Sequence, residues 1–367
     1  HPQKQPRCDP PEKWDNRAAF PSQRLSPNAL MATLPALKKL AQSLLVLWGV
    51  ATLVFFLFHM VSGDPARMML GQVEDPVALE ALRAAYGLDQ PLLVQYGHYL
   101  NGLSPWGVQP DGGLGFKAID MQTSYQQRGV PVTSLLAETL PQTGLLAILS
   151  MTFALLLGIP LGMSAALKPN TWWDRAVVLL STSGMALPSF FSAVLIAWFF
   201  GFVLAPWTGL SMTGGLIELD DFGEGEVWQW KHAILPTLTL GIRPLGVIAQ
   251  MMRSSALEVM SQDYVRTAYA KGLSKALVLR RHVFRNALNP LVTTVSGWLA
   301  GLFSGAVFVE TVFGWHGTGK LMVDALESRD FPLVMGCVLS LSAVFVVIQL
   351  LVDLSYQWID PRLQKPS

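Results

Sequence analysis

Six long apolar runs constrain this chain more than any other feature of its sequence. They cover residues 41–61, 141–167, 177–205, 234–258, 291–309 and 333–354. An apolar helix of roughly 20 residues crosses the hydrocarbon layer of a bilayer, so each run is long enough to span a membrane. With 51% hydrophobic and only 14% charged residues, the chain is predicted to be an all-α polytopic membrane protein with six transmembrane helices.

The charges between these runs predict the side of the membrane on which each connection lies. Lys38 and Lys39 precede the first run, and Lys168 and Arg175 separate the second from the third. The connection between the fourth and fifth runs is strongly basic, with Arg253, Arg266, Lys271, Lys275, Arg280, Arg281 and Arg285. Short loops rich in Lys and Arg stay in the cytoplasm. Both chain termini are therefore expected on the cytoplasmic side.

The same features divide the chain into successive parts. They are a disordered tail over 1–35, a first transmembrane helix over 36–61, an extracytoplasmic segment with short helices over 62–140, a core with the five other transmembrane helices over 141–363 and a short tail over 364–367. Asp75 suits a helix N-cap and Gly87 suits a helix stop. One short helix is therefore expected over 76–86 and another over 91–100. The outer segment is interpreted either as a solvated cap or as a docking or gating surface.

The basic connection, over 259–289, contains a short helical pattern. One face of this helix would hold Tyr264, Val265, Ala268 and Gly272. Residues at these spacings share a helix face, and the small side chains of Ala268 and Gly272 would let another backbone approach closely. The pattern predicts a helix that lies in the groove of a partner. A helix that rests on anionic lipid is the alternative.

A series of motifs runs along the chain: HMVSGDPARMMLG at 59–71, YGLDQPLLVQY at 86–96, GIPLGMSAAL at 158–167, ALPSFF at 186–191, DYVRTAYAKGLS at 263–274, RHVFRNALNPL at 281–291, VETVFGWHGTGKLMVDALESRDFPLVMG at 309–336 and DPRL at 360–363. With these motifs in this order, residues 36–363 resemble the permeases of ABC importers, in the dipeptide/oligopeptide (peptide/nickel) branch. The resemblance implies a type I importer permease fold in a bacterial inner membrane, with both termini in the cytoplasm.

The resemblance also implies partners and a cargo. The chain would pair with a second, similar permease to form the transmembrane path for di- or oligopeptides, with a nickel complex or another small solute as alternative cargo. Two ABC ATPase subunits would bind ATP and Mg²⁺ on the cytoplasmic side, and an extracytoplasmic binding protein would deliver the peptide. The chain itself is expected to be no enzyme, to bind no cofactor or metal directly, and to contact lipid but no nucleic acid.

In such permeases the basic connection is a coupling loop whose helix enters a cleft of the ATPase. The residues that correspond to it are Asp263, Tyr264, Arg266, Thr267, Ala268, Ala270, Lys271, Gly272 and Leu273. The broader family carries Glu-Ala-Ala and later Gly at these places. This chain has Arg266 in place of the glutamate, so Asp263 or Glu258 would have to substitute for any contact of that carboxylate.

The glycine-rich stretch GWHGTGK at 314–320 resembles a phosphate-binding loop. The next residue is Leu321, where a phosphate-binding loop needs Ser or Thr for Mg²⁺. The charge pattern also places this stretch outside, away from ATP. We therefore expect residues 309–332 to form an external re-entrant or cap segment. Its acidic residues are expected to face the binding protein, and they are Glu310, Asp324, Glu327 and Asp330.

Arg243 lies near the middle of the fourth run, about 15 Å of helix from Arg253. A charge at this depth needs water or a partner, and a guanidinium can hold a peptide carboxylate with two hydrogen bonds. Arg243 is therefore a candidate for the translocation path, with a structural salt bridge or a backbone contact near Pro244 as the alternative. The other residues assigned to the path are Ser189, Ser192, Thr239, Gln250 and Ser296.

Two other classes of membrane protein compete with a transport subunit of this kind. An ion-coupled secondary transporter would need several intramembrane carboxylates, and Asp353 is the only clear one in the sequence. An intramembrane enzyme would need a catalytic arrangement, and the sequence has neither an HExxH nor a GxSxG motif.

Overall fold

The computed structural model describes residues 27–61, 66–67, 75–109, 112–127, 129–219 and 225–359. The expected tail up to residue 26 and the C-terminal tail 364–367 lie outside these ranges. The chain divides into two compact units, His1–Leu44 and Leu45–Ser367, and all contacts below lie within the second unit. Helix α1 (Pro27–Val61) begins before the expected start at residue 36. The end of the expected disordered tail is therefore helical.

In the part of the chain that the structure describes, five helices are long and apolar enough to cross a membrane, and a bent pair makes six if it counts as one span. The five lie at Lys38–Met60 of α1, Val132–Ala166 (α5), Trp230–Met260 (which includes α9, Ile234–Met260), Asn289–Phe313 (α13) and Phe331–Asp353 of α15 (Phe331–Ile359). The bent pair is α6 (Trp172–Ala186) with Ser189–Val203, which contains α7 (Ser189–Trp198). The predicted all-α polytopic architecture is confirmed.

The third apolar run is broken, although the sequence analysis expected one continuous helix. The two helices of the bent pair meet at an angle of 106° across Leu187 and Pro188. Proline disfavours a helical backbone in the residue before it, and Leu187 accordingly has φ −75° and ψ 131°. The helix therefore ends before Pro188, and a new helix starts after it in another direction.

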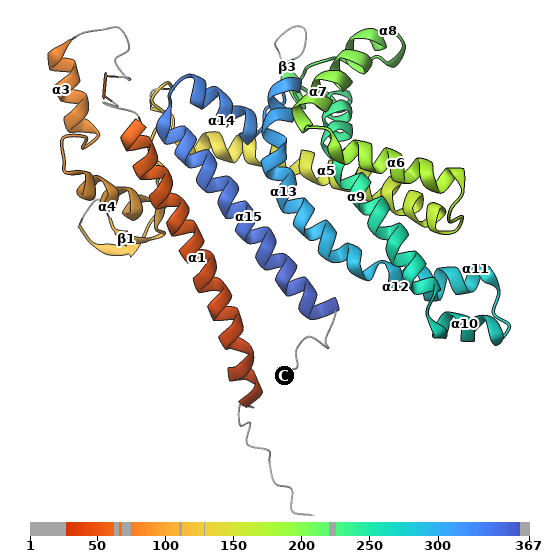
Figure 1. Ribbon diagram of the computed structural model, residues 1–367. Coiled ribbons are helices and arrows are strands. Elements are labelled where there is room, and N and C mark those ends of the chain that lie inside the picture. The colour runs from red at the N-terminus through yellow and green to blue at the C-terminus, as the bar shows by residue number, and fades with distance from the viewer. Residues whose placement is uncertain are drawn as a thin grey trace, which may run out of the picture. The chain divides into compact units, whose positions relative to one another are not determined.

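Helices α5 and α9 pack with their backbones close together. A Cβ added at Gly162 would lie 2.8 Å from the Cβ of Met252 and would clash with the carbonyl of Ala249, and one added at Gly158 would lie 3.0 Å from the carbonyl oxygen of Leu245. Small residues allow membrane helices to approach in this way. Figure 1 shows α9 among α5, α6 and α13, and all three contact it. The core of the chain is therefore built around α9.

The segments that connect the long helices lie on two opposite sides of the helices. In Figure 1, α10 (Asp263–Ala270) and α12 (Arg285–Ala287) lie toward the bottom, as do the C-terminal ends of α9 and α15. Helices α3 (Pro76–Ala85) and α14 (Thr318–Glu327) lie toward the top. The basic connection and the C-terminal end of the last span thus share one side, as the charge pattern predicts.

The start of the outer segment follows the expected local signals. The side chain of Asp75 accepts hydrogen bonds from the backbone N–H groups of Val77 at 2.9 Å and Ala78 at 3.3 Å. Gly87, at φ +63°, follows the end of α3, close to the expected helix at 76–86. The second expected helix is α4 (Leu92–Leu103).

Two short antiparallel strand pairs were not expected from the sequence. The first joins β1 (Trp106–Val108) to β2 (Leu114–Phe116), and the second joins β3 (Ile217–Leu219) to β4 (Glu226–Trp228). Strands of three residues are too short to show a period-two pattern. The glycines at the centre of β1 and β2 make the first pair still harder to predict from the sequence, because glycine is depleted in strands.

Replacing Gly162 with Val should destabilise the packed helices, because the side chain has no room beside Ala249 and Met252. Overpacking of this kind typically costs about 1–3 kcal/mol. The thermal unfolding midpoint of the purified protein in detergent should therefore fall. The matched control is Gly301→Val in α13, where an added Cβ meets nothing within 4 Å. Equal midpoints for the two variants would contradict the close approach of α5 and α9.

Candidate functional site

Helix α10 has defined ends in the basic connection. It begins at Asp263 and is followed by Gly272, which has φ +79°. The N–H of Gly272 donates to the carbonyl of Tyr269 at 2.9 Å, and the N–H of Leu273 donates to that of Ala268 at 3.3 Å. Glycine reaches this left-handed conformation without the steric cost of a Cβ. The helix stop predicted at Gly272 is therefore present.

The apolar side of α10 faces the chain's own core, which corrects the expected docking face. Val265 and Ala268 are 2% and 6% exposed, and they belong to the same buried cluster as Val278, Val283 and Ala287. These last three residues come from α11 (Lys275–Val278), a following π-helical turn and α12. The connection folds back on itself and covers the small face of α10. Ala268 therefore packs α10 against the rest of the chain and is not available to a partner.

The rest of the surface of α10 is exposed and carries most of the residues assigned to coupling. Exposed are Asp263, Tyr264, Arg266, Thr267, Tyr269, Ala270, Lys271 and Gly272, whereas Leu273 is half-buried. Arg266 and Asp263 lie 3.7 Å apart as an exposed ion pair, and such pairs contribute little to stability. The face available to a partner is thus polar and aromatic, and it includes Tyr269, which the sequence analysis did not select.

A side-chain contact fixes α10 to the segment that leads into α13. The Nδ2 of Asn286, in α12, donates to the hydroxyl of Tyr264 at 3.0 Å and to the carbonyl oxygen of His282 at 2.7 Å. Helix α12 precedes α13 by one intervening residue, and α10 follows α9 after two residues. The helix is therefore held between the ends of two membrane spans.

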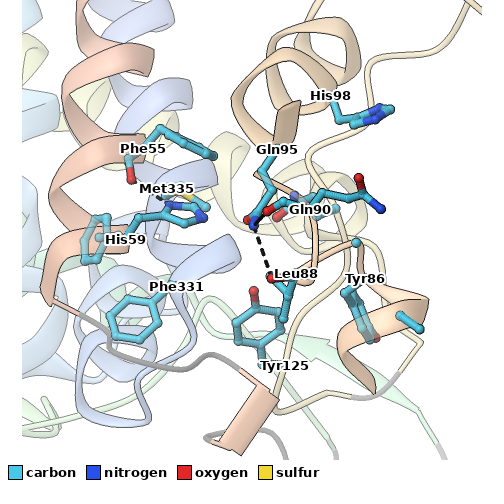
Figure 2. A pocket seen from close by; sticks show the side chains of 14 residues that line it. Phe55, His59, Tyr86, Leu88, Gln90, Gln95, His98, Tyr125, Phe331 and Met335 are labelled. Carbon is cyan, nitrogen blue, oxygen red and sulfur yellow. Dashed lines mark hydrogen bonds between the residues drawn. The ribbon is translucent and has the colours of Figure 1, made fainter. Parts of the chain in front are cut away.

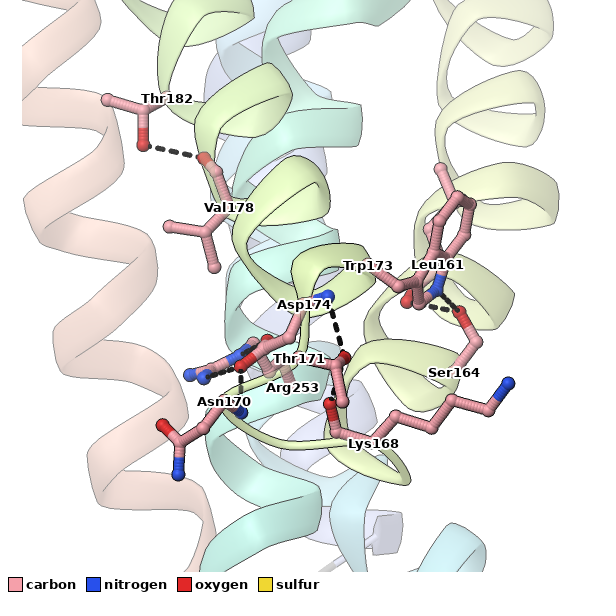
Figure 3. A network of polar contacts seen from close by, with 10 residues as sticks. All are labelled: Leu161, Ser164, Lys168, Asn170, Thr171, Trp173, Asp174, Val178, Thr182 and Arg253. Carbon is pink, nitrogen blue, oxygen red and sulfur yellow. Dashed lines mark hydrogen bonds and ion pairs between the residues drawn. The ribbon is translucent and has the colours of Figure 1, made fainter.

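An ion pair with a buried carboxylate joins α6 to α9 near the basic connection (Figure 3). Asp174 is 3% exposed and accepts from Nε and Nη2 of Arg253, the latter at 2.7 Å. The backbone N–H of Asn170 donates to the same carboxylate at 2.9 Å, and Thr171 caps the start of α6. Asp174 was missed in the sequence analysis. The only sequence signal for its role is that Asp174 is an acidic residue in an otherwise basic connection.

The glycine-rich stretch at 314–320 surrounds a carboxylate of its own chain. Glu310 is fully buried, and it accepts hydrogen bonds from the Oγ1 of Thr143 at 2.7 Å and from the N–H groups of Gly319 at 2.7 Å and Lys320 at 3.1 Å. A Cβ at Gly317 would clash with the same carboxylate. The free N–H groups at the start of α14 form an anion site, and Glu310 occupies it. Glu310 therefore cannot face a binding protein as expected.

Asp330 is also buried, which corrects a second expected surface residue. It is 1% exposed and accepts from the hydroxyl of Ser124 and from the N–H groups of Tyr125 at 3.1 Å and Gln126 at 3.3 Å. It thereby ties the loop before α5 to the start of α15. Of the four acidic residues, Asp324 and Glu327 are exposed, and Asp324 pairs with Lys320 at 2.7 Å.

The residues assigned to the path are only partly exposed. Arg243 is exposed, with its guanidinium carbon 5.9 Å from the ring centre of Trp298 in α13. Ser192 and Thr239 are buried, and the Thr239 hydroxyl donates to the carbonyl of Leu235 at 2.8 Å, so neither lines an open path in this structure. Half-buried are Gln250, Ser189 and Ser296.

One side of α9 beyond the middle of the span contains no fully buried residue and forms a stripe. It consists of Arg243, Val247, Gln250, Ser254 and Glu258. These positions share a helix face, because they are spaced three or four residues apart. The stripe points away from the chain's own core and is polar at four of five positions.

A cavity of about 570 Å³ lies on the outer side (Figure 2). It is lined by Phe55 and His59 of α1, by the turn between α3 and α4, and by Phe331 and Met335 of α15. Burial, followed by the nearby charge of Asp330, raises the pKa of the Tyr125 phenol in its wall. The lining combines aromatic rings with the side-chain amides of Gln90, Gln95 and Gln122, and the residues that line it include no Asp, Glu, Lys or Arg. Among the described residues, no group of three or more His, Cys, Asp or Glu could hold a metal ion.

The chain matches known proteins over nearly its whole length. Residues 158–365 match the family described as binding-protein-dependent transport system inner membrane component, and residues 35–147 match the N-terminal region of such components. A dipeptide transport system permease protein, DppB, of Alkalihalophilus pseudofirmus is 34% identical, over 90% of this chain and 98% of the relative.

Two relatives from Escherichia coli K12 are similar to the same extent. A probable D,D-dipeptide transport system permease protein, DdpB, is 37% identical over 87% of this chain and 94% of its own length. The glutathione transport system permease protein GsiC is 36% identical over 89% and 98%. The chain belongs to the family of binding-protein-dependent transport system inner membrane components, and it is a multi-pass protein of the bacterial plasma membrane.

Proposed function

We propose that this chain is a permease subunit of an ATP-driven ABC importer and forms, with a second permease, the transmembrane path for di- or oligopeptides. The relatives that carry this proposal are named for the transport of dipeptides and of glutathione, a small peptide. These names favour a peptide over a nickel complex. ATP and Mg²⁺ would bind to two separate ATPase subunits, and an extracytoplasmic binding protein would deliver the cargo.

The exposed side of α10 is the proposed contact with an ATPase subunit. Its polar and aromatic surface stands on a buried apolar base, in which Val265 and Ala268 are almost fully covered. A rigid, exposed helix can enter a partner's groove with little further loss of conformational entropy. Closure of the ATPase pair would then shift α10 and, through it, the spans on either side.

Reconstitution of the complete transporter tests this function. Liposomes that contain this chain, its partner permease and the ATPases should accumulate a dipeptide when ATP and the binding protein are supplied. The chain alone, with an ion gradient and no ATP, should accumulate none, because the ATPases that supply the energy are then absent. Two of its span carboxylates, Asp174 and Glu310, are held by Arg253 and by backbone N–H groups. Uphill uptake by the chain alone would favour the ion-coupled alternative.

Replacing Tyr269 with Ala should weaken binding to the ATPase, because this aromatic side chain stays exposed beside the buried face of α10. Truncation of an aromatic hot-spot residue in an interface costs about 2 kcal/mol or more, which is about a thirtyfold loss of affinity or more. Pull-down of the ATPase subunits with the permease measures it. The control is Leu277→Ala in α11, since Leu277 is 42% and Tyr269 43% exposed. Recovery of equal amounts of ATPase with both variants would contradict a contact at Tyr269 of α10.

Arg243 is proposed to bind the carboxylate of the passing peptide. It is exposed inside a membrane span, which is costly unless water or a partner is present. Among the described residues it forms no ion pair, and its contact is the ring of Trp298. The expected alternative of a structural salt bridge is therefore not seen in the described part of the chain.

Changing Arg243 to Gln should slow uptake of a dipeptide with a free carboxylate by roughly tenfold, since a charge-assisted hydrogen bond contributes about 1.5–3 kcal/mol. Uptake of the same dipeptide with an amidated C-terminus should change little. The control is Ser254→Ala on the same stripe of α9. If uptake of both peptides slows equally, Arg243 has a structural role. If uptake of neither peptide slows, Arg243 lies outside the path.

A further inference from the structure

The β1–β2 hairpin of the outer segment exposes an apolar face. Its register pairs Trp106 with Phe116 and Val108 with Leu114. Residues at alternate positions of a strand lie on one face, so these four side chains share it. They are between 53% and 77% exposed, and the rings of Trp106 and Phe116 meet edge to face at 4.7 Å. No charged side chain belongs to this set.

The other face of the hairpin is fixed to helix α4. The side chain of Asn101 donates to the carbonyl of Val108 at 3.1 Å and accepts from its N–H at 3.0 Å. A Cβ at Gly107 would clash with the Asn101 side chain, so this glycine permits the close approach. The apolar face is therefore held outward by a defined contact.

Helix α4 is fixed in turn beside the membrane spans. The hydroxyls of Tyr96 and Thr52 lie 2.6 Å apart, and Tyr99 is buried in a cluster with Ala51, Val54, Phe55, Met335 and Leu339. Thr52 precedes the end of the first span at Met60 by eight residues, or about 12 Å of helix. Leu339 follows the start of the last span at Phe331 by the same number. Helix α4 thus lies beside the spans and not beyond their ends.

Figure 1 shows β1 below α4, farther than α4 from the outer end of α15 and from α3. The exposed residues of α1 at the same level are also apolar, among them Trp48 and Leu53. Tryptophan and other aromatic residues favour the boundary between headgroups and acyl chains. From this depth and composition we propose that the hairpin inserts its apolar face into the outer leaflet of the bilayer. The outer segment would then be anchored in lipid as well as on α1.

A nitroxide label at Phe116 tests this in the complete transporter, reconstituted in liposomes. The label is attached to cysteine in a chain with Cys8→Ser, since Cys337 is buried. Accessibility to oxygen is compared with accessibility to a water-soluble nickel chelate. Position 53 is the lipid reference, and Val77 in α3 is the aqueous reference because Val77 and Phe116 are both 77% exposed.

The ratio of oxygen to nickel accessibility at position 116 should match that at position 53. It should exceed that at position 77 by at least about tenfold, because a polar chelate is excluded from hydrocarbon. A label at Leu114, which is 75% exposed, repeats the test. Peptide uptake by each labelled transporter shows that it is folded. A ratio like that of position 77, or shielding from both reagents by a protein partner, overturns the proposal.

Discussion

The close contact between α5 and α9 positions the polar stripe of α9 and the proposed coupling helix α10. In lipid there is little hydrophobic drive to bring helices together, so small residues that admit a neighbouring backbone decide which helices pack. Gly158 and Gly162 provide that space against Leu245 and Ala249. With one side of α9 fixed in the core, the polar stripe that begins at Arg243 must point outward. The cytoplasmic end of α9, and α10 after it, are positioned by the same contact.

Three charged groups of the described spans differ in their surroundings. Asp174 and Glu310 are buried, and each has fixed partners: Arg253 for the first, and Thr143 with the N-terminal N–H groups of α14 for the second. A buried charge without such partners would be costly. Arg243 differs, since it is exposed and touches an aromatic ring. This contrast is the physical reason for assigning Arg243 to transport and the two carboxylates to structure.

Much of the fold was predictable from the sequence, because long apolar runs and basic loops depend on local composition. The short helix α3 was predictable from Asp75 and Gly87 for the same reason. The break at Pro188 was not, since Pro160 and Pro244 continue their helices where neighbouring helices support them. At the site, the end of α10 at Gly272 was predictable from one residue type.

The partners of the acidic residues were not predictable. Thr143 lies 167 residues from Glu310, and Ser124 lies 206 residues from Asp330, so no local pattern reports that these carboxylates are buried. The direction of the α10 stripe was misread for a related reason. A helical period identifies an apolar face, but it does not say whether the chain itself or a partner covers that face.

The way α10 is held connects it to the candidate path. The apolar face of α10 is buried against its own chain, so a partner can contact α10 only through its polar and aromatic residues. Any displacement of α10 therefore also moves the segments packed against it. The hydrogen bond between Tyr264 and Asn286 ties that movement to the start of α13, while the other end of α10 continues from α9. These two spans carry Trp298 and Arg243, whose side chains meet at 5.9 Å. A force applied to α10 would therefore act on the two helices that set the surroundings of Arg243, and the proposed ATPase contact would be connected in this way to the proposed peptide contact.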